Sequence, residues 1–261
     1  MLRMTKSLLA LFLACIAGAA GAEEVRVMIS AGFYGVYAEM APAFERATGH
    51  TLVTSRGPTV GDSPEAIPNR LARGESADAV IGDGRGADDL AKRGFIRPET
   101  WTEFAKSKVG MVVREGAPKP DISTADALKA TLLAAKSVAY SDSTSGTYLS
   151  TTLFPKLGIA DQLAAKSRKV RGPPSGEPVA AVVARGEAEI GFQQMSELMH
   201  VSGVVVVGPI PEELQPGSSF GGAVTTNAKQ PRAAAELLKF LSSKEAAPVI
   251  TKMGLTPIAM P

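Results

Sequence analysis

The sequence is poor in the side chains that carry most covalent and metal chemistry. Its 261 residues include one cysteine and two histidines. Cys15 lies in an N-terminal segment that reads as a leader, so we expect the mature chain to have no disulfide, no cysteine nucleophile and no thiolate metal site. His50 and His200 have no ligand partner at helical or hairpin spacing, which argues against a metal site. The sequence therefore predicts a protein that holds neither a metal nor another cofactor.

Residues 1–22 have the layout of a secretory signal peptide. A basic start at Arg3 and Lys6 precedes a short apolar stretch, and the small residues at 20–22 offer a cleavage site. The apolar stretch is too short to span a membrane as a helix. Cleavage after Ala22 would remove two of the 28 basic side chains and leave 26 against 26 acidic ones. A neutral chain without clustered cations does not suit nucleic-acid binding, so we expect an exported, soluble monomer.

From Glu23 onward, short apolar runs alternate with helical patterns, which is typical of an α/β fold with a buried parallel sheet. The first unit has predicted strands at 25–30, 51–56 and 77–83, and predicted helices at 36–47, 65–73 and 87–92. The second unit has predicted strands at 108–114, 137–141, 167–171, 190–192 and 204–208. Its predicted helices lie at 124–135, from 145 onward, at 178–184 and at 193–199. A strand at 220–227 and helices at 232–241 and 244–253 complete the chain.

This order predicts two α/β lobes joined by two crossings of the chain. The first lobe would comprise residues 23–110 with 220–261, and the second lobe residues 111–219. Ligands of open α/β sheets lie beyond the carboxyl ends of the strands. We therefore expect the site in a cleft between the lobes, built by the loops that follow the strands.

Two short motifs match known signatures but not their structural context. GDGRGA at 82–87 fits the dinucleotide-binding pattern, but it follows the third predicted strand of its unit and not the first. GSSFG at 217–221 fits the nucleophile-elbow pattern, but a predicted strand follows Ser219 and both histidines precede it. We therefore expect neither a nucleotide site nor a serine hydrolase.

The segment SDSTSGTY at 141–148 follows a predicted strand and opens a predicted helix. Backbone N–H groups at a helix start, together with nearby hydroxyls, form a natural anion site. The alternative is plain N-capping by Ser143 or Ser145, which needs only one hydroxyl. Because the segment carries several hydroxyls, we favour the anion site. Its candidate residues are Ser141, Ser143, Thr144, Ser145, Gly146 and Thr147.

Three arginines, Arg56, Arg85 and Arg171, lie at or within three residues of the end of a predicted strand. A guanidinium in that position can grip a carboxylate with two hydrogen bonds. The alternative is that some of them only reach solvent, which is the common fate of an arginine. Further candidate binding residues in equivalent positions are Ser30, Gly32 and Phe33 after the first strand, Gly57, Pro58 and Thr59 after the second, and Gln193.

Three segments carry a family resemblance: SAGFYGVYAEMAPAFERATGH (30–50), SVAYSDSTSGTY (137–148) and EIGFQQMSEL (189–198). They resemble periplasmic type II solute-binding proteins of the molybdate-binding-like group, over essentially the whole mature chain. The resemblance implies the two-lobe periplasmic-binding-protein (type II) fold, a periplasmic location and a small anionic ligand. Molybdate binders of this group usually carry a serine-rich loop after the second strand and a tryptophan–methionine pair after the third. SRGPTVGDSPEAIPNRLARGE and GDGRGADDL stand there instead, which argues against molybdate itself.

The segments around 55–75 and 191–198 look more like a branch of this group that includes aconitate isomerases. That branch would interconvert trans- and cis-aconitate by an allylic proton shift without a cofactor. Such a shift needs carboxylate clamps, one base and stabilisation of negative charge. The candidate bases are Asp83 and Tyr148, whose alternatives are a helix cap and a packed aromatic ring. A receptor that passes a tricarboxylate or other small oxyanion to an ABC permease fits the same residues, so enzyme and carrier both stay open.

Overall fold

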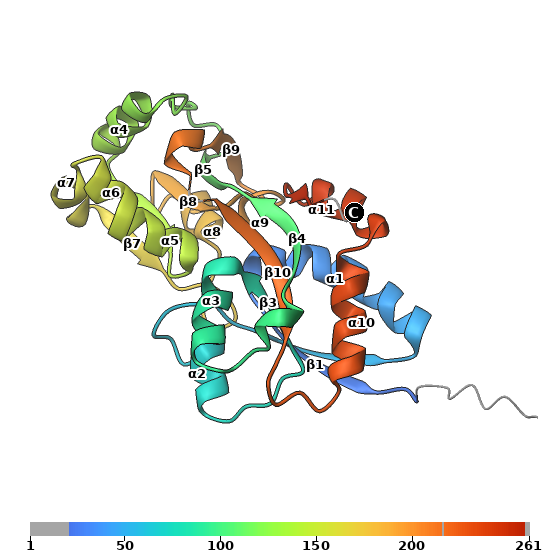
Figure 1. The fold of residues 1–261 in the computed structure, drawn as a ribbon. Helices are drawn as coiled ribbons and strands as arrows, with labels where there is room; N and C mark the ends of the chain where they lie inside the picture. Colours follow the sequence, from blue (N-terminus) through green and yellow to red (C-terminus); the bar gives the residue numbers. More distant parts are fainter. Residues whose placement is uncertain (1–20, 216, 259–261) are drawn as a thin grey trace, which may run out of the picture.

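The computed structural model describes residues 21–215 and 217–258, which form two lobes, each built on its own β-sheet (Figure 1). The predicted signal peptide lies outside the described residues except for its last two. Within the described ranges, no helix is long and apolar enough to cross a membrane.

The first lobe has a six-stranded sheet covered by helices on both faces. Its strand order is β11 (Thr256–Pro257), β4 (Thr102–Ser107), β10 (Ser218–Val224), β3 (Ala79–Asp83), β1 (Glu24–Ile29), β2 (Thr51–Arg56). Alternate residues of β1 face opposite sides of the sheet, as pleating requires. Val27 and Ile29 pack with α1 (Ala31–Thr48), α10 (Pro231–Leu241) and α11 (Ala247–Lys252). Met28 packs with α2 (Ile67–Ala72) and α3 (Gly84–Lys92) on the other face.

The second lobe has a five-stranded sheet. Its strand order is β7 (Ser167–Val170), β6 (Val138–Ser141), β8 (Ile190–Gln194), β5 (Val109–Arg114), β9 (Val204–Pro209). One face packs against α4 (Ala125–Ala134), α5 (Thr144–Tyr148), α6 (Phe154–Lys156) and α7 (Ala160–Ala164), with a π-helical turn, Leu149–Leu153, between α5 and α6. The other face packs against α8 (Val179–Ala184) and α9 (Met195–Leu198).

Both sheets are mixed, which corrects the expectation of a parallel sheet. β10 runs antiparallel to β3 and β4, and β5 runs antiparallel to β8 and β9. These are the two strands that enter a lobe directly after the chain crosses from the other one. A strand entering from the cleft must run away from it, whereas β1, β2, β3, β6, β7 and β8 run toward it. Their carboxyl ends therefore converge on the region between the lobes.

The predicted elements are otherwise confirmed, with small shifts of their ends. The predicted strand at 51–56 has the observed bounds of β2, and the helix predicted from Val36 begins earlier, at Ala31. β4 was missed because its sequence TEFAKS is half polar and has no strong apolar run. The lobe division at 110/111 and 219/220 stays a proposal. The chain changes sheets between β4 and β5 and again between β9 and β10, so both predicted boundaries fall one or two residues inside the strands β5 and β10.

Candidate functional site

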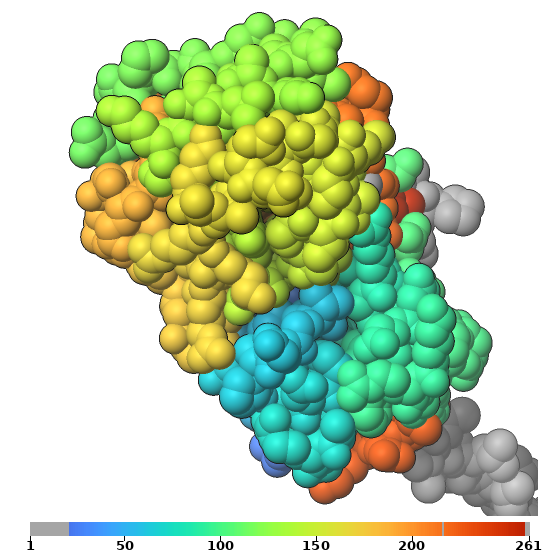
Figure 2. Space-filling view, turned by 90° about the vertical axis from the view of Figure 1, so that its left-hand side faces the viewer, coloured from blue at the N-terminus to red at the C-terminus, as the bar shows by residue number. Residues whose placement is uncertain are grey.

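A pocket lies between the two lobes, at the carboxyl ends of the strands that run toward the cleft. Figure 2 shows the green-to-gold segments of the second lobe stacked against the blue and teal segments of the first. The first lobe contributes Ser30, Ala31, Gly32, Pro58, Thr59, Asp83 and Phe220; the second contributes Ser141, Asp142, Ser143, Thr144, Gly172, Pro173, Gln193, Gln194 and Glu197. Contributions from both lobes mean that a ligand here would be enclosed when the lobes meet.

Ser30 follows β1 and faces this interlobe pocket with a polar atom that has no partner. The residue is 6% exposed, and its Oγ makes no hydrogen bond within the described structure. Gly32, two residues later, lies against the ring of Phe220, where a Cβ would come within 2.1 Å of the ring. Phe33 does not reach the pocket, because it packs in the core against Phe104, with 5.0 Å between ring centroids. A buried, unpaired hydroxyl is costly unless a ligand or water completes it.

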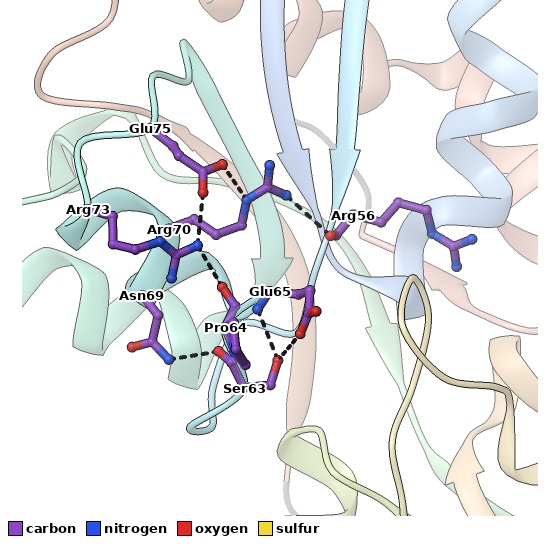
Figure 3. A network of polar contacts seen from close by, with 8 residues as sticks. All are labelled: Arg56, Ser63, Pro64, Glu65, Asn69, Arg70, Arg73 and Glu75. Carbon is purple, nitrogen blue, oxygen red and sulfur yellow. Dashed lines mark hydrogen bonds and ion pairs between the residues drawn. The ribbon is translucent and has the colours of Figure 1, made fainter.

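The loop after β2 carries Pro58 and Thr59 into the pocket. Polar contacts hold this loop against α2 (Figure 3). Asn69 donates to the Ser63 carbonyl over 2.8 Å, and Arg70 donates to the Arg56 carbonyl over 3.4 Å. Arg73 donates to the Pro64 carbonyl, and Glu75 pairs with both arginines. Gly57 is required where the loop doubles back, because a Cβ there would lie 2.0 Å from the Glu65 carbonyl oxygen.

Asp83, a predicted base, ends β3 and has its carboxylate occupied by three donors. It caps α3 by accepting from the Gly86 N–H over 3.0 Å, and it accepts from the hydroxyl of Thr59. Thr144 of the second lobe also donates to it over 2.8 Å. Asp83 is 4% exposed. The geometry gives this carboxylate a structural role in joining the lobes, while its role as a base stays a prediction.

The predicted anion segment brings three serine hydroxyls together. Ser141 Oγ lies 2.7 Å from Ser143 Oγ and 3.1 Å from Ser145 Oγ. Ser141 and Ser143 line the pocket, and Ser145 lies behind them. The turn requires glycine at position 146, because a Cβ there would lie 1.7 Å from the Ser141 carbonyl oxygen. Thr147 is exposed and outside the pocket.

The three predicted arginine clamps lie in different environments. Arg56 is half-buried, its guanidinium carbon lies 4.0 Å from the Tyr34 ring centroid, and its buried Nε has no partner in the described structure. Arg85 is exposed and lines a separate surface pocket beside Trp101. Arg171 is exposed; the Ser63 hydroxyl, and to a smaller extent Arg171, hold the pKa of Glu65 below its usual value. Only Arg56 is placed to act from a desolvated position.

Tyr148, the other predicted base, points away from the pocket. Its hydroxyl donates to the Leu214 carbonyl over 2.6 Å, and its ring belongs to the core of the second lobe. Burial raises its pKa, and the nearby Arg85, whose guanidinium carbon lies 5.5 Å from the ring centroid, lowers it. A base needs an acceptor atom within reach of the substrate, so the assignment stays a prediction to which the geometry lends no support.

The pocket also contains Glu197, which the sequence analysis missed. Gln193, at the end of β8, donates from Nε2 to Glu197 Oε2 over 2.6 Å, and its Oε1 accepts from the Val179 N–H. Burial raises the pKa of Glu197 to about 7, although Gln193 and then Arg56 act to lower it. The sequence GFQQMSEL offered a clue to this position, because Glu197 lies shortly after the end of a strand and four residues after Gln193.

Other pocket residues also escaped the sequence analysis. Asp142 and Phe220 lie within the segments 141–148 and 217–221 but were not chosen as candidates, and Gly172 and Pro173 belong to no motif. These residues meet only because separate strands converge. Among the described residues, no group of three or more His, Cys, Asp or Glu side chains could hold a metal ion. The polar side chains that line the pocket carry hydroxyl, amide and carboxyl groups.

Known proteins with similar sequences match nearly the whole chain. A protein from Pseudomonas sp named aconitate isomerase is 47% identical over 232 residues, covering 89% of this chain and 87% of that protein. The molybdate-binding protein ModA of Azotobacter vinelandii is 26% identical over 255 residues, covering 96% and 97%.

Solved structures share the fold at lower identity. The periplasmic molybdate-binding protein of Azotobacter vinelandii superposes with a TM-score of 0.68 at 19% identity, over 91% of this chain and 99% of that one. The family model for bacterial extracellular solute-binding proteins matches residues 25–256. The resemblance predicted from the sequence is confirmed, and the chain belongs to the bacterial extracellular solute-binding protein family.

Proposed function

We propose that this protein is a periplasmic aconitate isomerase, which interconverts trans- and cis-aconitate by a cofactor-free proton shift. The observation that carries the proposal is the 47% identity, over most of both chains, to a protein named aconitate isomerase. The leader-like segment at residues 1–22 supports export to the periplasm.

The interlobe pocket suits a small polycarboxylate. The unpartnered hydroxyl of Ser30, the cluster of Ser141 and Ser143, and the amide of Gln193 offer donors from both lobes. Arg56 does not line the pocket, but its positive charge acts on the pocket carboxyl group of Glu197, and its buried Nε has no partner. Hydrogen bonds from several neutral donors plus one guanidinium can hold carboxylate groups without a metal.

The reaction moves one proton across a three-carbon unit. A base takes a proton from the methylene carbon of trans-aconitate, and the electron pair spreads over the allylic system and its carboxylates. Return of a proton to the former vinylic carbon completes the shift, with no net gain or loss of atoms or electrons. Fixed donors around the carboxylates stabilise the negative charge that develops between these steps.

NMR of the purified protein tests the proposal directly. The protein is incubated with trans-aconitate in deuterated water, and we expect cis-aconitate to form at a catalytic rate with no added metal. Pretreatment with a chelator is expected to change nothing. Saturable binding without any turnover would contradict the proposal.

The second candidate is a receptor that delivers a tricarboxylate or another small oxyanion to an ABC permease. The family match and the likeness to a molybdate-binding protein favour it. Calorimetry with aconitate, citrate, molybdate and sulfate separates the candidates further. Tight molybdate binding with no response to tricarboxylates would support this oxyanion receptor in place of the isomerase.

A further inference from the structure

We propose that Glu197 is the group that transfers the proton in this pocket, with Gln193 as its positioning residue. The inference rests on the proposed isomerase activity and adds to it the identity of the catalytic side chain. Neither base suggested by the sequence, Asp83 or Tyr148, has that role in this assignment.

The first support is the position of the Glu197 carboxyl group. It lines the interlobe pocket from α9, while Gln193 lines it from β8. The Gln193 amide is itself fixed, because its oxygen accepts from the Val179 N–H over 3.1 Å and its nitrogen donates to Glu197 Oε2. Among the described residues, no hydrogen bond reaches the other oxygen, Oε1. One carboxyl oxygen is therefore held in place while the other remains available to a substrate.

The second support comes from the other acidic groups of the pocket. Asp83 has three donors, from Thr59, Gly86 and Thr144. Asp142 accepts from the Gly172 N–H over 3.1 Å. A carboxylate saturated by protein donors is a weak base, because proton uptake would break those bonds. Among the described residues, Glu197 and Asp142 each accept one such bond, so this comparison sets Asp83 aside as a base and keeps Glu197.

The third support is the protonation behaviour of Glu197. Burial raises its pKa to about 7; the Gln193 hydrogen bond and then Arg56 lower it, and Asp142 and Asp83 raise it. Both protonation states are therefore populated near neutral pH. A group that first accepts and later donates a proton works best under that condition.

The proposed step is balanced. Glu197 Oε1 takes a proton from the substrate methylene carbon, and the C–H electron pair forms a double bond to the central carbon. The former π pair is left on the vinylic carbon, in conjugation with its carboxylate. The Glu197 carboxyl group then gives a proton to that carbon and returns to its ionised form.

The test compares variants of the full-length mature protein with trans-aconitate as substrate. We expect Glu197→Gln, which can still accept the Gln193 hydrogen bond, to lower kcat by roughly 10²–10⁴-fold. Binding of trans-aconitate, measured by calorimetry, should change by less than about fivefold. Glu197→Asp should recover part of kcat. Glu115→Gln, which removes an exposed carboxylate of the second lobe outside the pocket, is the matched control and should behave as the wild type.

The pH profile tests the positioning role. Wild-type kcat should rise with pH around 7 as Glu197 ionises, and this pH-dependent rise should be absent in Glu197→Gln. Gln193→Met removes a hydrogen bond that favours the ionised form of Glu197. The rise of kcat in this variant should therefore occur at higher pH than in the wild type. Full activity of Glu197→Gln beside an active wild type would overturn this inference and leave the isomerase proposal intact. An inactive wild type would overturn both.

Discussion

Arg56 ends β2 and Arg171 directly follows β7, yet we expect them to contribute very differently to ligand binding. Arg56 lies against Tyr34 with a buried, unpartnered Nε, whereas Arg171 is exposed. Loss of a desolvated charge that grips a carboxylate typically costs about 2–5 kcal/mol. An exposed arginine contributes at most about 1 kcal/mol.

We therefore expect Arg56→Ala to weaken trans-aconitate binding by at least about 30-fold in calorimetry. Arg171→Ala should change it by less than about fivefold. Arg56→Lys should not restore binding, since a lysine cannot reproduce the planar, forked donors. Equal losses in the two alanine variants would show that the guanidinium of Arg56 is not the clamp.

Glu197 gives the stability of the protein a definite dependence on pH. Its pKa is about 7 in the folded protein, against 4.5 for an unperturbed glutamate. Between these values the folded state binds more protons than the unfolded state, so the free energy of unfolding falls as pH rises. The contribution of this residue is most favourable below pH 4.5 and is lost as pH passes through 7.

Glu197→Gln should remove this dependence, because the amide does not ionise. We expect the variant to have a higher Tm than the wild type at pH 8, with the difference shrinking toward pH 5. Differential scanning calorimetry of both proteins across this range provides the measurement. A difference in Tm that stays constant with pH would contradict the raised pKa.

Single residues also show how far the sequence predicts the site. Ser30, Thr59, Ser141, Ser143 and Gln193 line the pocket, and the sequence could place them there because each lies at or shortly after the end of a recognisable strand. The directions of the side chains could not be predicted from the sequence. For example, the place of Tyr148 in the sequence does not indicate that its hydroxyl donates to the Leu214 carbonyl. Glu197 escaped because acidic residues in the first turn of a helix usually have a capping role.

At the scale of elements, the turn from β6 into α5 depends on Gly146. A Cβ at this position would lie 1.7 Å from the Ser141 carbonyl oxygen. We expect Gly146→Ala to destabilise the protein by about 1–3 kcal/mol, as overpacking of a tight site does. Gly217→Ala is the control, because a Cβ there meets nothing within 4 Å. Thermal unfolding of the two variants compares them, and equal Tm values would show that the turn relaxes without cost.

The elements were predictable where their pattern is local. Runs such as the apolar strands β3 and β8 are bounded by clear loops, and their periodicity suffices to place them. Strand direction is not local. β5 and β10 run antiparallel to their neighbours because the chain enters each lobe through them. The crossings between the lobes depend on tertiary packing, which the sequence pattern does not display.

At the scale of the whole molecule, the two lobes are joined across the pocket by side chains as well as by the chain itself. Thr144 of the second lobe donates to Asp83 of the first, and Ser196 donates to the Gly32 carbonyl over 2.7 Å. These bonds exist only while the lobes are together. The stability of the closed arrangement therefore depends on them, and so does the affinity for any ligand that the closed lobes enclose.

Thr144→Val tests this dependence, because it keeps the shape of the side chain and removes the hydroxyl. A hydrogen bond to a charged group contributes about 1.5–3 kcal/mol, so the ratio of closed to open molecules should fall by roughly 10- to 150-fold. We expect small-angle scattering to show a larger radius of gyration for the ligand-free variant than for the wild type, and trans-aconitate to reduce the difference. Thr144→Ser retains the hydroxyl and should behave as the wild type. If Thr144→Val leaves both the scattering and the affinity unchanged, the bond to Asp83 does not hold the lobes together.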